Sequence, residues 1–344
     1  MSLDFLKAHE NHRRLRRVRW EAPSMKSLKS LASLVLLLAV LPVGGGASAQ
    51  EKIRLSYSSR SYAFLPAYIA QANEFFRDER LEVELIQMRP ESSSPALYNG
   101  DVRATLTFGS TVGGILRGFP FKIVAVLTEK PMQFLVVSSE IRTVHDLKGK
   151  KLGVSRLLGT DEQAAHAILE ALGINPKDVK SIALGDEPIR REAIRKGVVQ
   201  AVAVSPPGPV QLAREGFRIL GGPRDLKISV PSAGLAVTET TLKETPGLVR
   251  KLIRALLRGL KVIHGNPEMT RRVMVQWLSQ SPQIAADSYE LIISSFSPNG
   301  ETDESALKAV IDARRKSGNV EKDVRLEQVV DFRLVREVQK ELGL

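Results

Sequence analysis

The chain has 344 residues, with 50 lysines and arginines, 38 aspartates and glutamates, and no cysteine. Its content of 43% hydrophobic and 26% charged residues is typical of a globular protein and not of a disordered or collagen-like chain. The absence of cysteine excludes a disulfide framework, a thiolate metal site, a cysteine nucleophile and a lipidated N-terminal cysteine.

An apolar run, Leu31–Val43, lies near the N-terminus and is 13 residues long. It is too short to cross a bilayer, which needs about 20 apolar residues. Two lysines precede the run, and the small residues Ala47-Ser48-Ala49 follow it. This order predicts a signal peptide over residues 1–49 that is cleaved after Ala49. We therefore expect a periplasmic protein, secreted through the inner membrane, that begins at Gln50.

Residues 1–24 allow two interpretations. Met25-Lys26-Ser27-Leu28-Lys29 has the pattern of a complete signal start by itself, which indicates that residues 1–24 come from a mis-assigned start codon. Alternatively, Arg13-Arg14 belongs to a twin-arginine signal, although this pair lies 16 residues before the apolar run. The long separation favours the first interpretation.

The net charge of +12 raises the question of a nucleic-acid partner. The first 49 residues carry +5 of this charge, and the remainder carries +7. In the remainder the lysines and arginines are scattered, with few aromatic residues between them. A nucleic-acid groove needs clustered charge and aromatic stacking platforms, so we expect a solvated basic surface and no nucleic-acid partner.

Strands and helices are expected to alternate after residue 50. Alternating apolar and polar residues predict strands at Ile53–Ser58 and Leu81–Gln87, with a helix at Pro66–Phe76 between them. Further strands are expected at Ala104–Phe108, Ile123–Leu127, Phe134–Ser138, Leu152–Ser155, Val179–Leu184, Ala201–Val204 and Phe217–Leu220, with helices at 161–172, 187–196 and 207–214. This alternation predicts an α/β protein with a mostly parallel, doubly wound sheet.

The last hundred residues are expected to be almost entirely helical. Thr245-Pro246 begins a helix whose apolar residues, from Leu248 to Ile263, repeat at intervals of three and four. Asn266-Pro267 and Ser281-Pro282 begin two further helices in the same way.

The chain is expected to cross between two lobes twice. Phe134–Ser138 leads into a new set of strands, and Gly234–Thr238 leads back before the helical region begins. We expect a first lobe of residues 50–137 plus 239–344 and a second lobe of residues 138–238, with a cleft between them.

Small polar and cationic residues follow four of the expected strands. In open α/β sheets ligands bind beyond the carboxyl ends of strands, where the free N–H groups of helix N-termini attract anionic oxygens. We predict that nine residues bind ligand: Ser58, Arg60, Tyr62, Ser110, Thr111, Ser155, Arg156, Thr160 and Ser205.

Several of these residues also have simpler interpretations. Thr160 with Gln163 fits a helix capping box, and Ser205 before two prolines fits another cap. Tyr62 alternatively packs in the core, and Arg60 and Arg156 alternatively pair with surface carboxylates. If both arginines reach the cleft, they offer an anion two forked cations from opposite lobes.

The sequence lacks the common catalytic and cofactor motifs. It has no phosphate-binding G-x-x-x-x-G-K-[ST] loop, no H-E-x-x-H and no G-x-G-x-x-G. The histidines after residue 50, at positions 145, 166 and 264, are too widely spread to suggest a metal cluster. We therefore predict no catalytic residue, no metal and no cofactor.

Several short motifs follow one another along about 270 residues of the chain. They are Pro66–Ala70, Asn73-Glu74-Phe75-Phe76, Leu81–Glu84, Asn99-Gly100-Asp101-Val102, Asp146–Ser155, Ala201–Pro207 and Gly216-Phe217-Arg218. Together they resemble the solute-binding proteins of ABC transporters in the nitrate/sulfonate/taurine and thiamine-pyrimidine-precursor group. Asn73 stands where such proteins often have glycine, which affects a turn and not the site.

This resemblance implies a two-lobed periplasmic-binding-protein fold of type II, with two crossover strands, that closes over a small-molecule solute. It also implies a monomer without catalytic activity that delivers the solute to an ABC permease in the inner membrane. The basic excess and the two arginines favour an organic anion, while a sulfonate, an aromatic carboxylate, nitrate and a pyrimidine all remain open. A ligand-sensing or scaffold protein would look the same in sequence. Pyrimidine-synthesising enzymes of this fold depend on a cysteine-rich segment, which this chain lacks.

Overall fold

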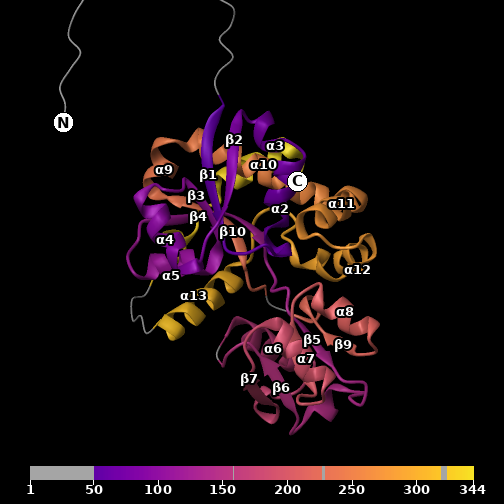
Figure 1. Cartoon of the computed structure of the whole chain (residues 1–344). Coiled ribbons are helices and arrows are strands. Elements are labelled where there is room, and N and C mark those ends of the chain that lie inside the picture. The colour runs from indigo at the N-terminus through magenta and orange to yellow at the C-terminus, as the bar shows by residue number, and fades with distance from the viewer. Residues whose placement is uncertain (1–49, 158, 227–228, 319–323) are drawn as a thin grey trace, which may run out of the picture. The chain divides into compact units, whose positions relative to one another are not determined.

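The computed structural model describes residues 50–344 except 158, 227–228 and 319–323, so the expected signal peptide lies outside the described residues. The strands form two five-stranded sheets, in the orders β2-β1-β3-β10-β4 and β7-β6-β8-β5-β9 (Figure 1). The first sheet contains β1 (Glu51–Tyr57), β2 (Leu81–Gln87), β3 (Ala104–Thr107), β4 (Phe121–Thr128) and β10 (Ala233–Thr238). The second contains β5 (Phe134–Val137), β6 (Lys151–Val154), β7 (Lys180–Ala183), β8 (Ala201–Val204) and β9 (Arg218–Gly221).

Each sheet is mixed, because one inner strand runs against its neighbours. β10 pairs antiparallel with both β3 and β4, and β5 pairs antiparallel with both β8 and β9. These two strands are where the chain passes between the sheets, from β4 to β5 and from β9 to β10. The α/β fold with two crossover strands is confirmed. The expected parallel pairing is found for β1 with β2 and β3, and for β6 with β7 and β8.

We call the first sheet with its packed helices the first lobe, and the second sheet with α6, α7 and α8 the second lobe. β5 belongs to the second sheet and β10 to the first. The exact residue boundaries of the two lobes stay a prediction.

Helices connect and cover the strands. In the first half of the chain they are η1 (Tyr62–Phe64), α2 (Leu65–Ala72), α3 (Phe75–Asp78), α4 (Pro90–Asn99), α5 (Phe108–Leu116), η2 (Val144–Leu147) and α6 (Thr160–Ala171). Then follow η3 (Pro176–Asp178), α7 (Glu187–Arg195), α8 (Gly208–Arg214), η4 (Pro223–Asp225), α9 (Glu239–Glu244) and α10 (Pro246–Gly265). The chain ends with α11 (Pro267–Leu278), α12 (Pro282–Ile292), η5 (Ile293–Ser295), α13 (Glu304–Gly318), α14 (Leu326–Val329) and α15 (Arg333–Leu342), which confirms the helical C-terminal region.

The single helix expected at Pro66–Phe76 is two helices. Glu74 has a φ of 59°, and this left-handed residue ends the path of α2 before α3 begins. The side chain of Asn73 closes α2 by donating from Nδ2 to the carbonyl of Ile69 at 2.9 Å. The departure at Asn73 therefore lies at a turn, as expected.

Of the five predicted caps, two are wrong and two are confirmed, while Thr245 precedes α10 with its hydroxyl donating to the Thr241 carbonyl. Gly159, not Thr160, precedes α6, and α8 begins only at Gly208 because Ser205 belongs to a turn closed by the Gly208 N–H. By contrast, the side chains of Asn266 and Ser281 accept N–H bonds from Met269 and Ile284, as caps before proline.

The core of the first lobe is built around α10, whose apolar stripe is fully buried. Gly259 of α10 lies directly against the backbone of Pro66 in α2, where a methyl group would overlap the Pro66 carbonyl oxygen. Two further apolar clusters cover the faces of the second sheet. Leu291 of α12 packs against both the first-lobe core and the second-sheet cluster that contains Phe134.

Candidate functional site

The nine predicted residues follow the carboxyl ends of four strands. Ser58, Arg60 and Tyr62 follow β1, and Ser110 and Thr111 lie in the first turn of α5 after β3. Ser155, Arg156 and Thr160 lie between β6 and the start of α6, and Ser205 follows β8. Because β1 and β3 are parallel, as are β6 and β8, each group gathers at one edge of its sheet.

The residues after β1 divide into exposed and buried side chains. Ser58 is half-buried and Arg60 is exposed. Tyr62 is buried, and its hydroxyl donates a hydrogen bond to Gln280 between α11 and α12. Burial raises the pKa of Tyr62. Tyr62 thus fastens η1 to the C-terminal helices, the core interpretation that the sequence left open.

An aromatic group that the sequence reasoning missed includes Tyr57, the last residue of β1. Tyr68 of α2 donates from its hydroxyl to that of Tyr57 at 2.6 Å, and its ring stacks on Trp277 of α11. Burial is the main reason that the pKa of Tyr68 is raised, and the charge of Arg60 opposes this shift. The spacing of these residues in the sequence gives no signal of their contact.

The first turn of α5 is held by hydroxyl groups. Ser110 and Thr111 donate to the carbonyl of Thr107 at 3.4 and 2.7 Å. Beneath them, buried Ser93 of α4 bonds to the hydroxyls of Thr105 and Thr107 at 2.9 and 3.0 Å. This network joins the start of α4 to the end of β3 and fixes where α5 begins.

A second arginine, Arg314 of α13, lies against the start of α5. A methyl group at Gly109 would overlap Nη2 of Arg314, so the guanidinium occupies the space beside this glycine. Burial and the positive charge of Arg156 lower the pKa of Arg314. A cation continuing the apolar stripe of α13 was the available signal for Arg314.

The loop after β6 is organised by a buried carboxylate. Ser155 donates from its N–H and its hydroxyl to Asp161 at 2.6 and 2.7 Å. Asp161 also lies 3.6 Å from Nη1 of Arg190, and both side chains are buried. Thr160 and Arg156 are exposed. Asp161 thus holds the loop that carries Arg156.

Ser205 is hydrogen-bonded to Glu187, an acidic residue that the sequence reasoning missed. The Ser205 N–H donates to Glu187 of α7 at 3.2 Å, and Gln133 donates to the Ser205 hydroxyl at 3.4 Å. The Pro206–Pro207 peptide bond that follows is cis. Burial raises the pKa of Glu187, while the Ser205 N–H and the charge of Arg191 oppose this shift.

The NMT1/THI5-like family profile matches residues 61–270, which include every strand of the two sheets except β1 and seven of the nine predicted residues, all but Ser58 and Arg60. The chain belongs to the NMT1/THI5-like family. This agrees with the group of solute-binding proteins that the sequence motifs resemble.

Proteins similar to this NMT1/THI5-like chain in sequence or in fold include binding proteins and an enzyme. The riboflavin-binding protein RibY of Chloroflexus aurantiacus is 27% identical over 226 residues, which are 63% of this chain and 64% of that protein. The periplasmic sulfonate-binding protein SsuA of Methylobacillus flagellatus has a TM-score of 0.68 at 16% identity, covering 86% of this chain and 96% of that one. The desulfurization enzyme DszB has a TM-score of 0.61 at 13% identity, covering 85% and 99%. The fold therefore carries both binding and catalysis.

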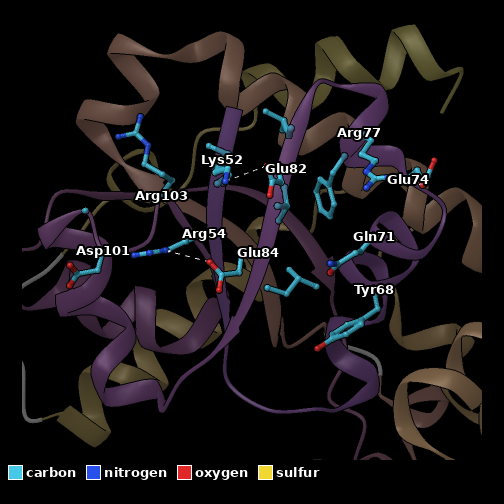
Figure 2. Close-up of a pocket in the computed structure, with 16 residues that line it drawn as sticks. Lys52, Arg54, Tyr68, Gln71, Glu74, Arg77, Glu82, Glu84, Asp101 and Arg103 are labelled. Carbon is cyan, nitrogen blue, oxygen red and sulfur yellow. Dashed lines mark hydrogen bonds and ion pairs between the residues drawn. The ribbon is translucent and has the colours of Figure 1, made fainter. Parts of the chain in front are cut away.

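A groove of about 1160 Å³ in this NMT1/THI5-like protein runs beside β1, β2, α2 and α3. Figure 2 shows Lys52 and Arg54 pointing toward Glu82 and Glu84 on the neighbouring strand, at 3.9 and 3.5 Å. None of the nine predicted residues lines the groove. Four basic and four acidic side chains line the groove, and three ion pairs form among them, so the groove offers a small solute little net charge.

Within residues 50–344 and outside the gaps, no three histidine, cysteine or acidic residues converge as metal ligands. In the same residues no helix has the length and apolar character required to cross a bilayer.

Proposed function

We propose that this protein binds a small organic anion between its two lobes as the extracytoplasmic component of an ABC importer. The observation that carries the proposal is the placement of cationic and hydroxyl side chains at strand ends of both lobes. In the first lobe Ser110 lies in the first turn of α5, and Arg314 of α13 packs against Gly109 of the same turn. In the other lobe Arg156 lies before α6. An anion at these strand ends meets N–H groups, hydroxyls and guanidinium groups.

The relatives support a binding role. The names of RibY and SsuA describe proteins that bind riboflavin and sulfonates. Binding by two hinged lobes fits the chain crossings at β4–β5 and β9–β10, because ligand contacts from both lobes favour a closed state over an open one. The expected signal peptide supports a periplasmic location, and a permease of the inner membrane would receive the solute from a monomer.

The proposal is tested by thermal-shift screening of the purified protein against alkanesulfonates, aromatic carboxylates, nitrate, pyrimidines and riboflavin. Stabilisation by one anionic class is expected, because a ligand that binds only the folded state raises the melting temperature. Stabilisation by neutral compounds alone would contradict the anionic solute, and no stabilisation by any compound would contradict the binding role.

Transport and catalysis are separated by two further measurements. Deleting the gene is expected to abolish uptake of the labelled solute by the cells, whereas a sensor would leave uptake intact. The solute recovered from the purified protein is expected to have an unchanged mass. A changed mass would instead support an enzyme, as in DszB.

A further inference from the structure

The inference concerns the direction of the hydrogen bond made by the Ser155 hydroxyl, at the carboxyl end of β6 in the second lobe. Ser155 bonds from Oγ to Oδ1 of Asp161 at 2.7 Å and from its N–H to Oδ2 at 2.6 Å. These are the short distances of charge-assisted hydrogen bonds to an ionised carboxylate. A carboxylate only accepts, so Ser155 gives both its N–H and its hydroxyl proton to Asp161.

Arg190 of α7 fixes the orientation of Asp161. Its Nη1 lies 3.6 Å from Oδ2 of Asp161, and both side chains are buried. The same guanidinium donates to the carbonyl of Gly185 after β7 at 2.6 Å and to that of Ala203 in β8 at 3.1 Å. Asp161 is thus tied to the ends of three neighbouring strands, and turning it away from Ser155 would separate a buried ion pair.

Ser155 is left with lone pairs alone to offer a solute. A serine hydroxyl has one proton and two lone pairs, and Asp161 takes the proton. Among the described residues no group donates to the Ser155 oxygen, and the side chain is half-buried. A solute at this strand end can therefore donate an O–H or N–H to Ser155, whereas an oxyanion there would meet only lone pairs.

Ser205, at the end of the neighbouring strand β8, has the opposite hydrogen-bonding direction. Its hydroxyl accepts from Nε2 of Gln133 at 3.4 Å, and its own proton remains for an acceptor. Since β6 and β8 are parallel, the two hydroxyls follow the same edge of the sheet. This edge thus presents one hydroxyl that accepts and one that donates.

We propose that Ser155 is a specificity-determining residue that selects a solute with an O–H or N–H donor in addition to its anionic group, and that Asp161 and Arg190 are positioning residues that impose this direction on Ser155. The inference rests on the proposed function and adds a second group by which the solute is recognised. The anionic group itself binds where donors remain, as at Ser205 and Arg156, because Ser155 has no proton to give it.

The test titrates three sulfonates that differ in one group into the purified protein by calorimetry. Isethionate has a hydroxyl that donates, propanesulfonate has a methyl group in its place, and acetonesulfonate has on the same carbon a ketone oxygen that only accepts. The parent is expected to bind isethionate roughly tenfold more tightly than either of the others, the usual effect of one hydrogen bond.

Ser155→Ala is expected to abolish this preference, so that isethionate and propanesulfonate bind within about twofold of each other. Ser138→Ala is the matched control. The Ser138 hydroxyl also donates to a carboxylate, that of Glu140 at 3.3 Å, but Ser138 follows β5, which runs antiparallel to β8 and ends at the opposite edge of the sheet. The preference of this variant for isethionate is expected to equal that of the parent.

Asp161→Asn keeps the shape of the side chain and reverses the direction of the hydrogen bond. The Ser155 N–H and Arg190 both face Oδ2, so the amide oxygen takes that place and the amide nitrogen takes the place of Oδ1, where it donates to the Ser155 oxygen. The Ser155 proton is then released, and acetonesulfonate is expected to bind roughly fivefold more tightly than to the parent. A damaged fold lowers affinities, so a merely structural role does not produce this gain.

A preference for isethionate that survives in Ser155→Ala overturns the inference, as does a parent that binds the three sulfonates equally or binds none of them. No gain for acetonesulfonate in a folded Asp161→Asn protein also overturns it, and if that variant does not fold, Ser155→Ala decides alone. If the parent binds no sulfonate but another solute in the screen, the proposed binding role survives; if it binds no solute, both proposals fail.

Discussion

Arg214 of α8 and Asp287 of α12 form an ion pair, 2.6 Å between Nη2 and Oδ2, that joins the second lobe to the C-terminal helices of the first. Arg224 of η4 adds a second contact to α12, because it donates a hydrogen bond to the carbonyl of Glu290 at 2.5 Å. The hydrogen bond from Arg214 is the main cause of the lowered pKa of Asp287. The lobes are thus held together by polar contacts on the side where Leu291 also packs against both cores.

Replacing Asp287 by Asn is expected to widen the distribution of distances between the lobes. The pair is exposed, so its loss is worth less than about 1 kcal/mol and changes the ratio of open to closed states by at most about fivefold. The chain has no cysteine, so labels on Lys177→Cys and Lys243→Cys allow this distribution to be measured by electron spin resonance.

The charge-swapped double variant, Arg214→Asp with Asp287→Arg, is the control and is expected to restore the parental distribution. Because pairing lowers the pKa of Asp287, the contribution of the pair is present above the ordinary aspartate range. It is lost as the pH falls through the lowered pKa. An unchanged distribution in Asp287→Asn at neutral pH would show that the pair does not restrain the lobes.

Ser93→Ala is expected to destabilise the first lobe by about 1–3 kcal/mol, because its hydroxyl serves Thr105 and Thr107 in a buried network. Urea unfolding of the purified protein measures this loss. Ser92→Ala on the same helix is exposed and is expected to stay within about 0.5 kcal/mol of the parent. Equal stabilities of the two variants would mean that the network contributes nothing.

The sequence predicted the strand ends well because they depend on local patterns. Short apolar runs followed by small polar residues place Ser110 after β3 and Ser155 after β6, and the structure has them there. The direction of a strand relative to its neighbours could not be predicted in this way, because the buried apolar residues of β5 and β10 carry no information on direction. Their antiparallel pairing follows from the chain path between the sheets, which no local pattern contains.

The residues that the sequence reasoning missed share long-range contacts. Arg314 reaches Gly109, Trp277 stacks on Tyr68, and each pair is far apart in the chain. A charged residue on an apolar helical stripe, as at Arg314, indicates an unusual partner but does not identify it. Which groups converge on a site depends on tertiary packing.

Glu187→Gln is expected to become relatively more stable than the parent as the pH rises from the ordinary glutamate range through the raised pKa of Glu187. Burial raises the pKa of Glu187, so the folded state favours the protonated acid and loses stability as the pH rises toward this raised pKa. Glutamine stays neutral and does not lose that contribution. Urea unfolding of both proteins at several pH values measures the difference, and a pH-independent difference would contradict the assigned effect of burial.

Gly259→Ala is expected to destabilise the protein by about 1–3 kcal/mol, since its methyl group would overlap the Pro66 carbonyl oxygen, a backbone atom that cannot rotate away. Gly247→Ala, on the same helix with nothing within 4 Å of the added methyl, is the matched control. There the higher helix propensity of alanine is expected to stabilise by up to about 1 kcal/mol. Both changes are measured by chemical denaturation. If both variants gained the same stability, α10 and α2 would have room to separate. The packing of α10 against Pro66 would then not restrict the size of the side chain at position 259.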